Sequence, residues 1–212
     1  MTRVKLCGLM SPEDIEMANL LRPDYTGFVF AANSRRCITE TQARHFRSLL
    51  SPDIPAVGVF VNEDPARVAF LLEKGVVDLA QLHGTEDETY LSHLRHMTAK
   101  PLIRAFQIRS QEDLTAAAAS TADYILLDSG TGSGSVFDWD LLNGFSRPYF
   151  LAGGLSPDNV AAAVRTLHPY AVDVSSGIET GGKKDPAKML QFMRQVKDSE
   201  HFTVSNQQTE RS

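Results

Sequence analysis

Short apolar and β-branched runs recur along the chain at a nearly regular interval. Neighbouring runs start between 22 residues apart (Arg3 to Tyr25) and 31 residues apart (Tyr25 to Ala56), which is room for one strand and one helix. The pattern therefore predicts eight strands that alternate with helices. The eight runs are RVKLC from Arg3, YTGFVF from Tyr25, AVGVF from Ala56, LAQL from Leu79, PLIRAF from Pro101, YILL from Tyr124, YFLA from Tyr149 and AVDVS from Ala171.

The segments between these runs carry helix signals. SPEDIEMANLL opens with Ser11 as a candidate N-cap, Pro12 at the first helical position and acidic residues in the first turn. SPDNVAAAVRTL repeats this arrangement from Ser156 and Pro157, which predicts a helix beginning near Pro157. The other segments begin acidic or capped and then place apolar residues at helical spacing. They are TETQARHFRSLL, DPARVAFLLEK, EDETYLSHLRH, SQEDLTAAAA and DPAKMLQFMRQV.

Strands that alternate with helices pair in parallel through right-handed crossovers. Eight such units, beginning with a strand and ending with a helix, predict a single-domain α/β fold, the (β/α)8 TIM barrel. An open doubly wound sheet is the alternative. Within the 212-residue chain we expect the barrel to cover residues 1–197, and we expect the polar, aperiodic residues 198–212 to fray.

A barrel gathers the residues that follow its strands at one face, and active sites lie at that face. Two connections there are longer than the rest, AANSRRC after the second strand and DSGTGSGS after the sixth. We expect the active site to be built from the chemistry-bearing residues of this face. They are Cys7, Arg35, Arg36, His83, Asp128, Gly153, Gly154, Ser175, Ser176 and Gly177.

The loops after the seventh and eighth strands predict a phosphate site. Gly153 and Gly154 allow close backbone approach, and the helix expected near Pro157 would supply N–H donors and a positive dipole end. Ser175, Ser176 and Gly177 follow the next strand, and barrels commonly bind phosphate at these two loops. A tight turn is the alternative for the two glycines. The segment Gly132–Gly134 is better suited to a loop that covers the substrate.

The ends of the sixth and fourth strands carry titratable groups. Asp128 directly follows four apolar residues, and burial under a closing loop would suit it to general-acid chemistry, with a surface loop acid or helix cap as the alternative. His83 is either a substrate contact or a structural histidine. Nothing in its spacing to other residues indicates a metal site.

Alternation along the first strand places Lys5 and Cys7 on the same side of the sheet. An unpaired ammonium inside a barrel is costly, and the eighth strand closes against the first, so Asp173 is the candidate partner of Lys5. Contact of Lys5 with water at the open end of the barrel is the alternative.

Composition narrows the partners and the compartment. The net charge of −5 provides no electrostatic footprint for nucleic acid or an anionic membrane. No apolar run reaches the length of a membrane span, and the polar start MTRVK lacks the apolar core of a signal peptide, so we expect a cytoplasmic protein. The only cysteines, Cys7 and Cys37, form no disulfide framework, and reduced thiols are expected.

From about Val4 to Lys197 the sequence resembles the phosphoribosylanthranilate isomerases of tryptophan biosynthesis. The resemblance rests on the ordered segments KLCGL, GFVF followed by SRR, VGVFVN, QLHG, LLDSG, GSGSVFDW, LAGGLSPDNV, VDVSSGIE and GKKDP. It implies an isomerase of aromatic amino acid biosynthesis that catalyses the Amadori rearrangement of N-(5-phosphoribosyl)anthranilate to 1-(2-carboxyphenylamino)-1-deoxyribulose 5-phosphate.

The resemblance also implies roles for individual residues. Cys7 matches the general base of the family, Asp128 its general acid and Arg36 the arginine that contacts substrate, and we expect His83 and Asp173 to bind substrate as well. Lys5 or the iminium charge of the substrate would favour the thiolate of Cys7.

The partner that the resemblance implies is a small phosphorylated aminosugar, bound by a monomer or homodimer. No metal or organic cofactor is expected, because the iminium of the substrate serves as the electron sink. The chain departs from the family at Arg35, where proline is common, and at Cys37, where tyrosine is usual.

Three rival functions remain. The analogous isomerase of histidine biosynthesis uses two aspartates, so Cys7 favours the anthranilate substrate. A Schiff-base aldolase needs a nucleophilic lysine, and no lysine ends the sixth strand. A phosphate-ligand sensor on an inactive barrel is the non-enzyme alternative.

Overall fold

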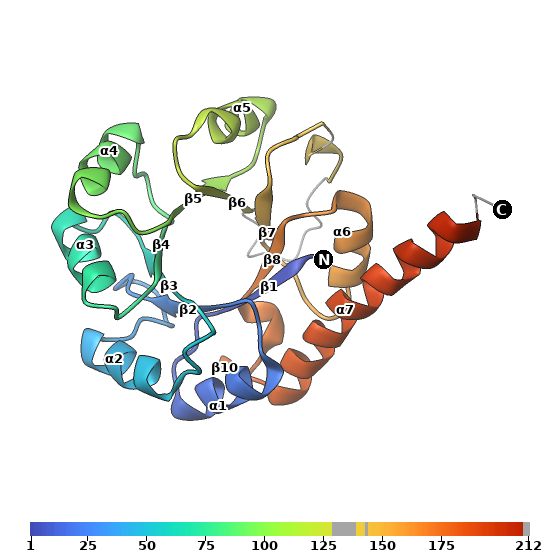
Figure 1. Cartoon of the computed structure of the whole chain (residues 1–212), viewed down its shortest axis with the longest axis horizontal. Helices are drawn as coiled ribbons and strands as arrows, with labels where there is room; N and C mark the ends of the chain where they lie inside the picture. Colours follow the sequence, from blue (N-terminus) through green and yellow to red (C-terminus); the bar gives the residue numbers. More distant parts are fainter. Residues whose placement is uncertain (129–138, 143, 210–212) are drawn as a thin grey trace.

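Eight parallel strands form a closed barrel in the computed structural model, which describes residues 1–128, 139–142 and 144–209 (Figure 1). Each strand pairs with the next, and the eighth pairs with the first, which confirms the (β/α)8 TIM barrel and excludes the open sheet. The strands begin where the apolar runs predict them, within one residue. They are β1 Arg3–Cys7, β2 Tyr25–Val29, β3 Ala56–Phe60, β4 Leu79–Leu82, β5 Leu102–Gln107, β6 Tyr124–Asp128, β7 Tyr149–Ala152 and β8 Ala171–Val174.

Helices surround the barrel on the outside (Figure 1). Ser11 caps the first of them through a reciprocal pair of contacts with Asp14, as its sequence signature predicts. Two short 3-10 helices, η1 Trp139–Leu142 and η2 Ser176–Ile178, and a small hairpin of β9 Glu179–Thr180 and β10 Lys183–Lys184 complete the described elements. The helices are α1 Pro12–Leu21, α2 Glu40–Leu49, α3 Pro65–Glu73, α4 Glu88–Met97, α5 Gln111–Ala119, α6 Val160–Leu167 and α7 Pro186–Thr209.

The helix after β7 begins later than the sequence predicts. Its first residue is Val160, with Asn159 as N-cap, so the expected start near Pro157 is wrong. Asn159 explains the difference, because its Oδ1 accepts from the Ser156 amide at 2.8 Å and its Nδ2 donates to the Gly154 carbonyl at 2.9 Å. These two bonds hold residues 156–159 in a turn ahead of the helix.

The final helix continues past residue 197, where we expected the barrel to end. α7 runs from Pro186 to Thr209 and extends away from the barrel in Figure 1. The last expected tail residues, 210–212, lie outside the described residues. The division of the chain at residue 197 therefore stays a prediction. None of the described helices is long and apolar enough to cross a membrane.

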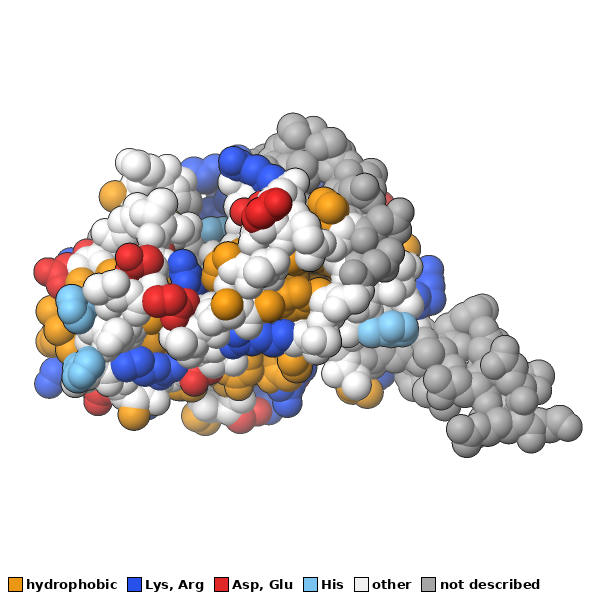
Figure 2. Space-filling model, turned by 90° about the horizontal axis from the view of Figure 1, so that it is seen from above, with side chains coloured by type: hydrophobic (Ala, Val, Ile, Leu, Met, Phe, Trp, Pro, Cys, Tyr) orange, Lys and Arg blue, Asp and Glu red, His pale blue; other side chains and the backbone are white. Residues whose placement is uncertain are grey.

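The barrel strands separate two apolar layers. Side chains such as Leu6, Phe28 and Leu82 face outward and pack beneath the helices. Val57 and Phe150 belong to a second cluster, which also includes Ile103 and Leu126 and fills the barrel interior. This alternation follows from the period of two residues along a strand. On the face shown in Figure 2, acidic and basic side chains are interspersed.

A buried ion pair crosses the seam where the barrel closes. Register places Lys5 of β1 beside Asp173 of β8, and Lys5 Nζ donates to Asp173 Oδ1 at 2.9 Å. Lys5 is fully buried and Asp173 is 9% exposed. The pairing predicted from the sequence is confirmed, and the alternative of a water-exposed Lys5 is wrong.

Removing only the cation should destabilise the fold strongly. Lys5→Met leaves the Asp173 carboxylate buried without a counter-charge, and we expect the free energy of unfolding to fall by about 3–5 kcal/mol in urea denaturation. The double variant Lys5→Met/Asp173→Leu should regain most of that loss, since neither charge is then buried. Arg44→Met, which breaks the exposed pair with Glu40, is the control and should cost less than about 1 kcal/mol. Equal losses in the single and double variants would contradict the prediction.

Candidate active site

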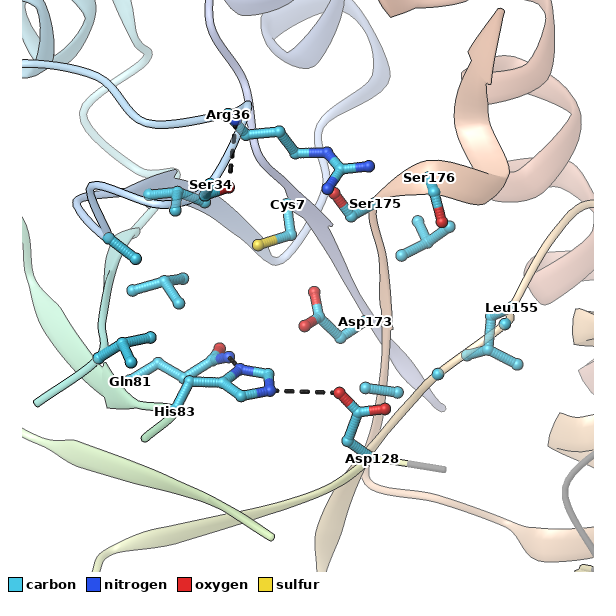
Figure 3. A pocket seen from close by; sticks show the side chains of 18 of the residues that line it. Cys7, Ser34, Arg36, Gln81, His83, Asp128, Leu155, Asp173, Ser175 and Ser176 are labelled. Atoms are coloured by element: carbon cyan, nitrogen blue, oxygen red, sulfur yellow. Dashed lines mark hydrogen bonds and ion pairs between the residues drawn. The ribbon is translucent and has the colours of Figure 1, made fainter. Parts of the chain in front are cut away.

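A cavity of about 610 Å³ opens at the carboxyl ends of the barrel strands. Figure 3 shows its lining, with Cys7 and Arg36 on one side, His83 and Asp128 on the opposite side and Asp173 between them. The barrel therefore brings nearly all the sequence-predicted site residues into one cavity. Those that line it are Cys7, Arg36, His83, Asp128, Gly153, Gly154, Asp173, Ser175 and Ser176.

Two residues predicted for the site, Gly177 and Arg35, do not line the cavity. Gly177 packs against the neighbouring loop, where an added Cβ would lie 1.8 Å from the Leu155 carbonyl oxygen. It supports the contact between the two predicted phosphate loops and does not line the cavity. The expected covering loop, Gly132–Gly134, lies outside the described residues.

Glycines make room around the Cys7 thiol. A Cβ on Gly27 would lie 2.6 Å from Cys7 Sγ, so β2 can pass beside the thiol only with glycine there. Gly8 adopts a left-handed φ of +75°, and a Cβ on it would lie 2.5 Å from Arg36 Cδ. Gly8 thus turns the chain sharply and leaves space for Arg36, while Gly27 leaves space for the Cys7 thiol. Cys7 and Cys37 are both free thiols.

Lys5 favours the thiolate of Cys7, as the sequence suggested, but its effect is smaller than that of burial. Burial raises the pKa of the Cys7 thiol, and the positive charge of Lys5 only partly opposes this effect. Burial alone would lower the pKa of Lys5, but the charges of Asp173 and Cys7 outweigh it and raise that pKa. Lys5 therefore does not by itself produce a thiolate, because its charge is already largely balanced by Asp173.

A chain of polar contacts runs along the opposite wall. His83 Nε2 lies 3.2 Å from Asp128 Oδ2, and His83 Nδ1 lies 2.8 Å from Gln81 Nε2. The side chains of His83 and Asp128 are 35% and 23% exposed, so both are reachable from the cavity. Sequence analysis did not identify Gln81, although the two-residue alternation of a strand places it on the same side as His83.

The loops after β7 and β8 line a further part of the cavity. Gly153 and Gly154 adopt left-handed φ values of +92° and +64°, which favour glycine. Ser175 and Ser176 of the β8 loop, labelled in Figure 3, line the same cavity as these two glycines. Lys184 Nζ donates to the Ser175 carbonyl at 3.0 Å and so ties this loop to the hairpin.

Glu179 is a site-forming residue that sequence analysis missed. Its carboxylate accepts from Arg36 Nε at 2.6 Å, from Arg36 Nη2 at 3.0 Å, from Arg35 Nη2 at 2.7 Å and from Lys184 Nζ at 2.8 Å. Burial would raise the pKa of Glu179, but the hydrogen bonds from Arg36 and Lys184 outweigh it and lower that pKa to about 2. One edge of the Arg36 guanidinium is therefore already occupied, and only the remaining N–H groups can reach a ligand.

Among the described residues, no cluster of three or more His, Cys, Asp or Glu side chains could hold a metal ion. The groups available for chemistry in the cavity are instead a thiol, carboxylates, an imidazole and an arginine. Such a set can transfer protons and bind anions.

Comparison with known proteins identifies relatives of the whole barrel. Residues 4–195 match the model of a protein family described as N-(5'phosphoribosyl)anthranilate (PRA) isomerase. A protein of Endomicrobium trichonymphae named N-(5'-phosphoribosyl)anthranilate isomerase is 45% identical, and the match covers 92% of this chain and 98% of that protein. The protein of the same name from Lacticaseibacillus paracasei is 44% identical, over 93% of this chain and 96% of the relative.

Solved structures agree with the sequence relatives. Phosphoribosyl anthranilate isomerase from Thermotoga maritima superposes with a TM-score of 0.85 at 35% identity, covering 93% of this chain and all of that chain. A second structure of such an isomerase, in complex with reduced 1-(o-carboxyphenylamino)-1-deoxyribulose 5-phosphate, gives a TM-score of 0.84 at 34% identity with the same coverage.

Neutralising Glu179 should alter the acid stability of the fold. The pKa of Glu179 is about 2 in the folded chain, against 4.5 for an unperturbed glutamate, so its contribution to the free energy of unfolding is full above about pH 4.5 and disappears as the pH falls toward 2. We therefore expect Glu179→Gln to be less stable than the wild type at pH 7, by a margin that narrows below pH 4.5.

The measurement is urea unfolding of both proteins over the pH range in which they remain folded. Glu40→Gln is the control because the Glu40 side chain forms an exposed ion pair with Arg44. Its free energy of unfolding should differ little from that of the wild type at every pH. A margin for Glu179→Gln that stays constant down to pH 3 would rule out this role of the carboxylate.

Proposed function

The chain belongs to the N-(5'-phosphoribosyl)anthranilate isomerase family, and we propose that its cavity catalyses the Amadori rearrangement of N-(5-phosphoribosyl)anthranilate to 1-(2-carboxyphenylamino)-1-deoxyribulose 5-phosphate. The observation that carries this proposal is the placement of Cys7 and Asp128 on opposite sides of one cavity (Figure 3). Arg36 and the loops after β7 and β8 line the same cavity and could each bind an anionic group of the substrate. A sugar bound between Cys7 and Asp128 would present different atoms to the two residues.

The phosphate of the substrate fits the loops after β7 and β8. The left-handed backbone at Gly153 and Gly154 allows a phosphate to approach their main-chain N–H groups, and Ser175 and Ser176, which line the same cavity, would add hydroxyl donors. Because α6 begins only at Val160, its N-terminus lies further along the chain than the sequence suggested. The proposed phosphate contacts are therefore mainly those of the loops.

The anthranilate ring fits the wall formed by β2, β3 and the loops that follow them. Val29, Ala31, Val59 and Val61 line this part of the cavity and provide an apolar surface for an aromatic ring. Arg36 lies at the same wall, and its remaining N–H groups suit the ring carboxylate. Glu179 restricts the guanidinium to one orientation before substrate binds.

The proposed reaction uses two proton transfers with the protein, one from Asp128 and one to Cys7, and a final tautomerisation that moves the O2 proton of the enol to C1. Asp128, in its protonated form, would donate to the furanose ring oxygen, so that the C1–O bond breaks and the glycosylamine becomes an open-chain iminium. Cys7, as thiolate, would then remove the C2 proton, and the electrons of that C–H bond would form the C1–C2 double bond of an enolamine while neutralising the iminium nitrogen. Tautomerisation of the enol gives the C2 ketone and completes the rearrangement.

The raised pKa of the Cys7 thiol agrees with this order of steps. In the free protein the protonated thiol is favoured, because burial disfavours the charge and Lys5 is paired with Asp173. The iminium appears only after ring opening, and its positive charge would then favour release of the thiol proton to water in the open cavity, so that the thiolate forms when the base is required.

Several sequence-based expectations remain predictions. They are the cytoplasmic location, the lack of a nucleic-acid partner, the lack of a cofactor and the choice between monomer and homodimer. The roles of His83 and Asp173 in substrate binding are part of this proposal.

Replacing either proton-transfer residue should reduce turnover without unfolding the barrel. We expect Cys7→Ser and Asp128→Asn each to lower kcat by about 10²–10⁴, the usual range for loss of a general base or acid. The assay follows the loss of substrate fluorescence with freshly generated phosphoribosylanthranilate, and circular dichroism checks the fold. Turnover at the wild-type rate in one variant would remove that residue from the mechanism.

The two neighbouring arginines should differ in their effect. Arg36→Ala removes the proposed carboxylate contact, and a charge-assisted hydrogen bond of about 1.5–3 kcal/mol corresponds to a loss of roughly 10–150-fold in kcat/KM. Arg35→Ala is the matched control, because the Arg35 side chain is 62% exposed and shares only Glu179 with its neighbour. Losses of the same size at both positions would indicate a diffuse positive field and not a specific contact.

A further inference from the structure

Gln81 is a buried amide whose hydrogen bonding is incomplete. It lies in β4 at the floor of the cavity and is 1% exposed. Its Nε2 lies 2.8 Å from His83 Nδ1, whereas its Oε1 has no hydrogen-bond partner among the described residues. Burying an amide with one unsatisfied atom is unfavourable. Among the described residues, the hydrogen bond with His83 is the one that compensates for burying this amide, so the role of that bond is what has to be explained.

The other side of the His83 ring determines which nitrogen carries the proton. His83 Nε2 faces Asp128 Oδ2 at 3.2 Å, and this oxygen accepts a hydrogen bond both when Asp128 is ionised and when its acid proton is on Oδ1. Nε2 must then carry a hydrogen, and in a neutral imidazole this leaves Nδ1 as an acceptor. Gln81 Nε2 is a donor at the correct distance from Nδ1. Both contacts thus agree on a single tautomer.

The remaining walls offer His83 few charged neighbours. Across the cavity lie Asp173 of β8, Cys7 of β1 and Arg36 of the β2 loop (Figure 3). The strands on either side of β4 contribute only uncharged lining residues, Val59 and Val61 from β3 with its loop and Gln107 from β5. Within the described lining, Asp128 and Gln81 are therefore the groups in hydrogen-bond contact with the ring.

We infer that Gln81 is a positioning residue, which donates to His83 Nδ1 and holds the imidazole as its Nε2–H tautomer so that the ring donates to Asp128. Its effect on catalysis rests on the proposed role of Asp128 as general acid. Once Asp128 has given its proton to the sugar, the carboxylate that remains accepts a hydrogen bond from His83 Nε2–H. Stabilising the carboxylate form makes Asp128 a stronger acid.

The tautomer can be measured without substrate. ¹⁵N–¹H correlation spectra of protein labelled at its 6 histidines report which imidazole nitrogen is protonated, and the His83 signals are those absent from His83→Asn. In the wild type we expect His83 to be protonated at Nε2 and bare at Nδ1 at neutral pH. A wild-type ring with the hydrogen on Nδ1 would overturn the inference.

Two variants of Gln81 separate the hydrogen bond from the space it fills. Gln81→Glu keeps the shape but offers His83 only acceptors when ionised, so Nδ1 should become protonated. Gln81→Met keeps the approximate length without a donor, so the two tautomers should become mixed. Gln107→Met is the control for this readout, because it removes another amide of the cavity, whose Oε1 accepts a hydrogen bond from Arg109 Nη2 and makes none with His83. It should leave the His83 signals unchanged.

Kinetics supply the second readout. Gln81→Met should lower kcat by roughly 3–10-fold, the effect of losing one neutral hydrogen bond, while KM changes by less than about twofold. If one variant does not fold, the wild-type tautomer and the other variant still decide. An unaltered His83 tautomer in a folded Gln81 variant would overturn the inference. A changed tautomer with an unchanged kcat would overturn the effect of the His83 hydrogen bond on the acidity of Asp128, whereas the acid role of Asp128 itself is decided by Asp128→Asn.

Discussion

The closure of β8 against β1 is the constraint on which the site depends. That seam places a lysine and an aspartate side by side in the barrel interior, where neither charge could remain alone. The pair fixes the level at which the two strands meet, and the residues two positions further along each strand, Cys7 and Ser175, then emerge at the cavity. The base candidate and the phosphate loop thus share one register.

A second carboxylate, that of Glu179, connects the loops that follow the barrel strands near this seam. Glu179 binds Arg36 from the β2 loop and Lys184 from the hairpin, and Lys184 also holds the Ser175 carbonyl. The anthranilate and phosphate ends of the proposed site are therefore joined through two side chains. Such a connection keeps the two anion-binding ends at a fixed separation, which favours a substrate of one length.

The sequence predicted most of the fold because its signals are local. Each strand is a short apolar run between helix caps, and seven of the eight observed strands begin at the predicted residue, β5 being one residue later. The start of α6 was misplaced because Ser156 and Pro157 form a good helix signature, while the side-chain bonds of Asn159 hold these residues in a turn. Two signals competed there, and the contacts of the folded loop decided between them.

The site was predictable where strand ends converge and unpredictable where loops meet. Gln81 could have been found from its two-residue spacing to His83. Glu179 could not, because its partner Arg36 is 143 residues away and their contact depends on how the β2 loop lies against the hairpin. The occupied edge of the Arg36 guanidinium follows from that same contact and has no signature in the sequence.

The Glu179 cluster also bears on how a ligand would reach the barrel. Three cations, Arg35, Arg36 and Lys184, surround one carboxylate, so the cluster carries an excess positive charge in a chain whose net charge is −5. An anion approaching from a distance is repelled by the molecule as a whole, but within a Debye length of about 8–10 Å it is attracted to the entrance. Added salt screens the distant repulsion as well as the nearby attraction, and the capture rate at the entrance follows the balance between the two.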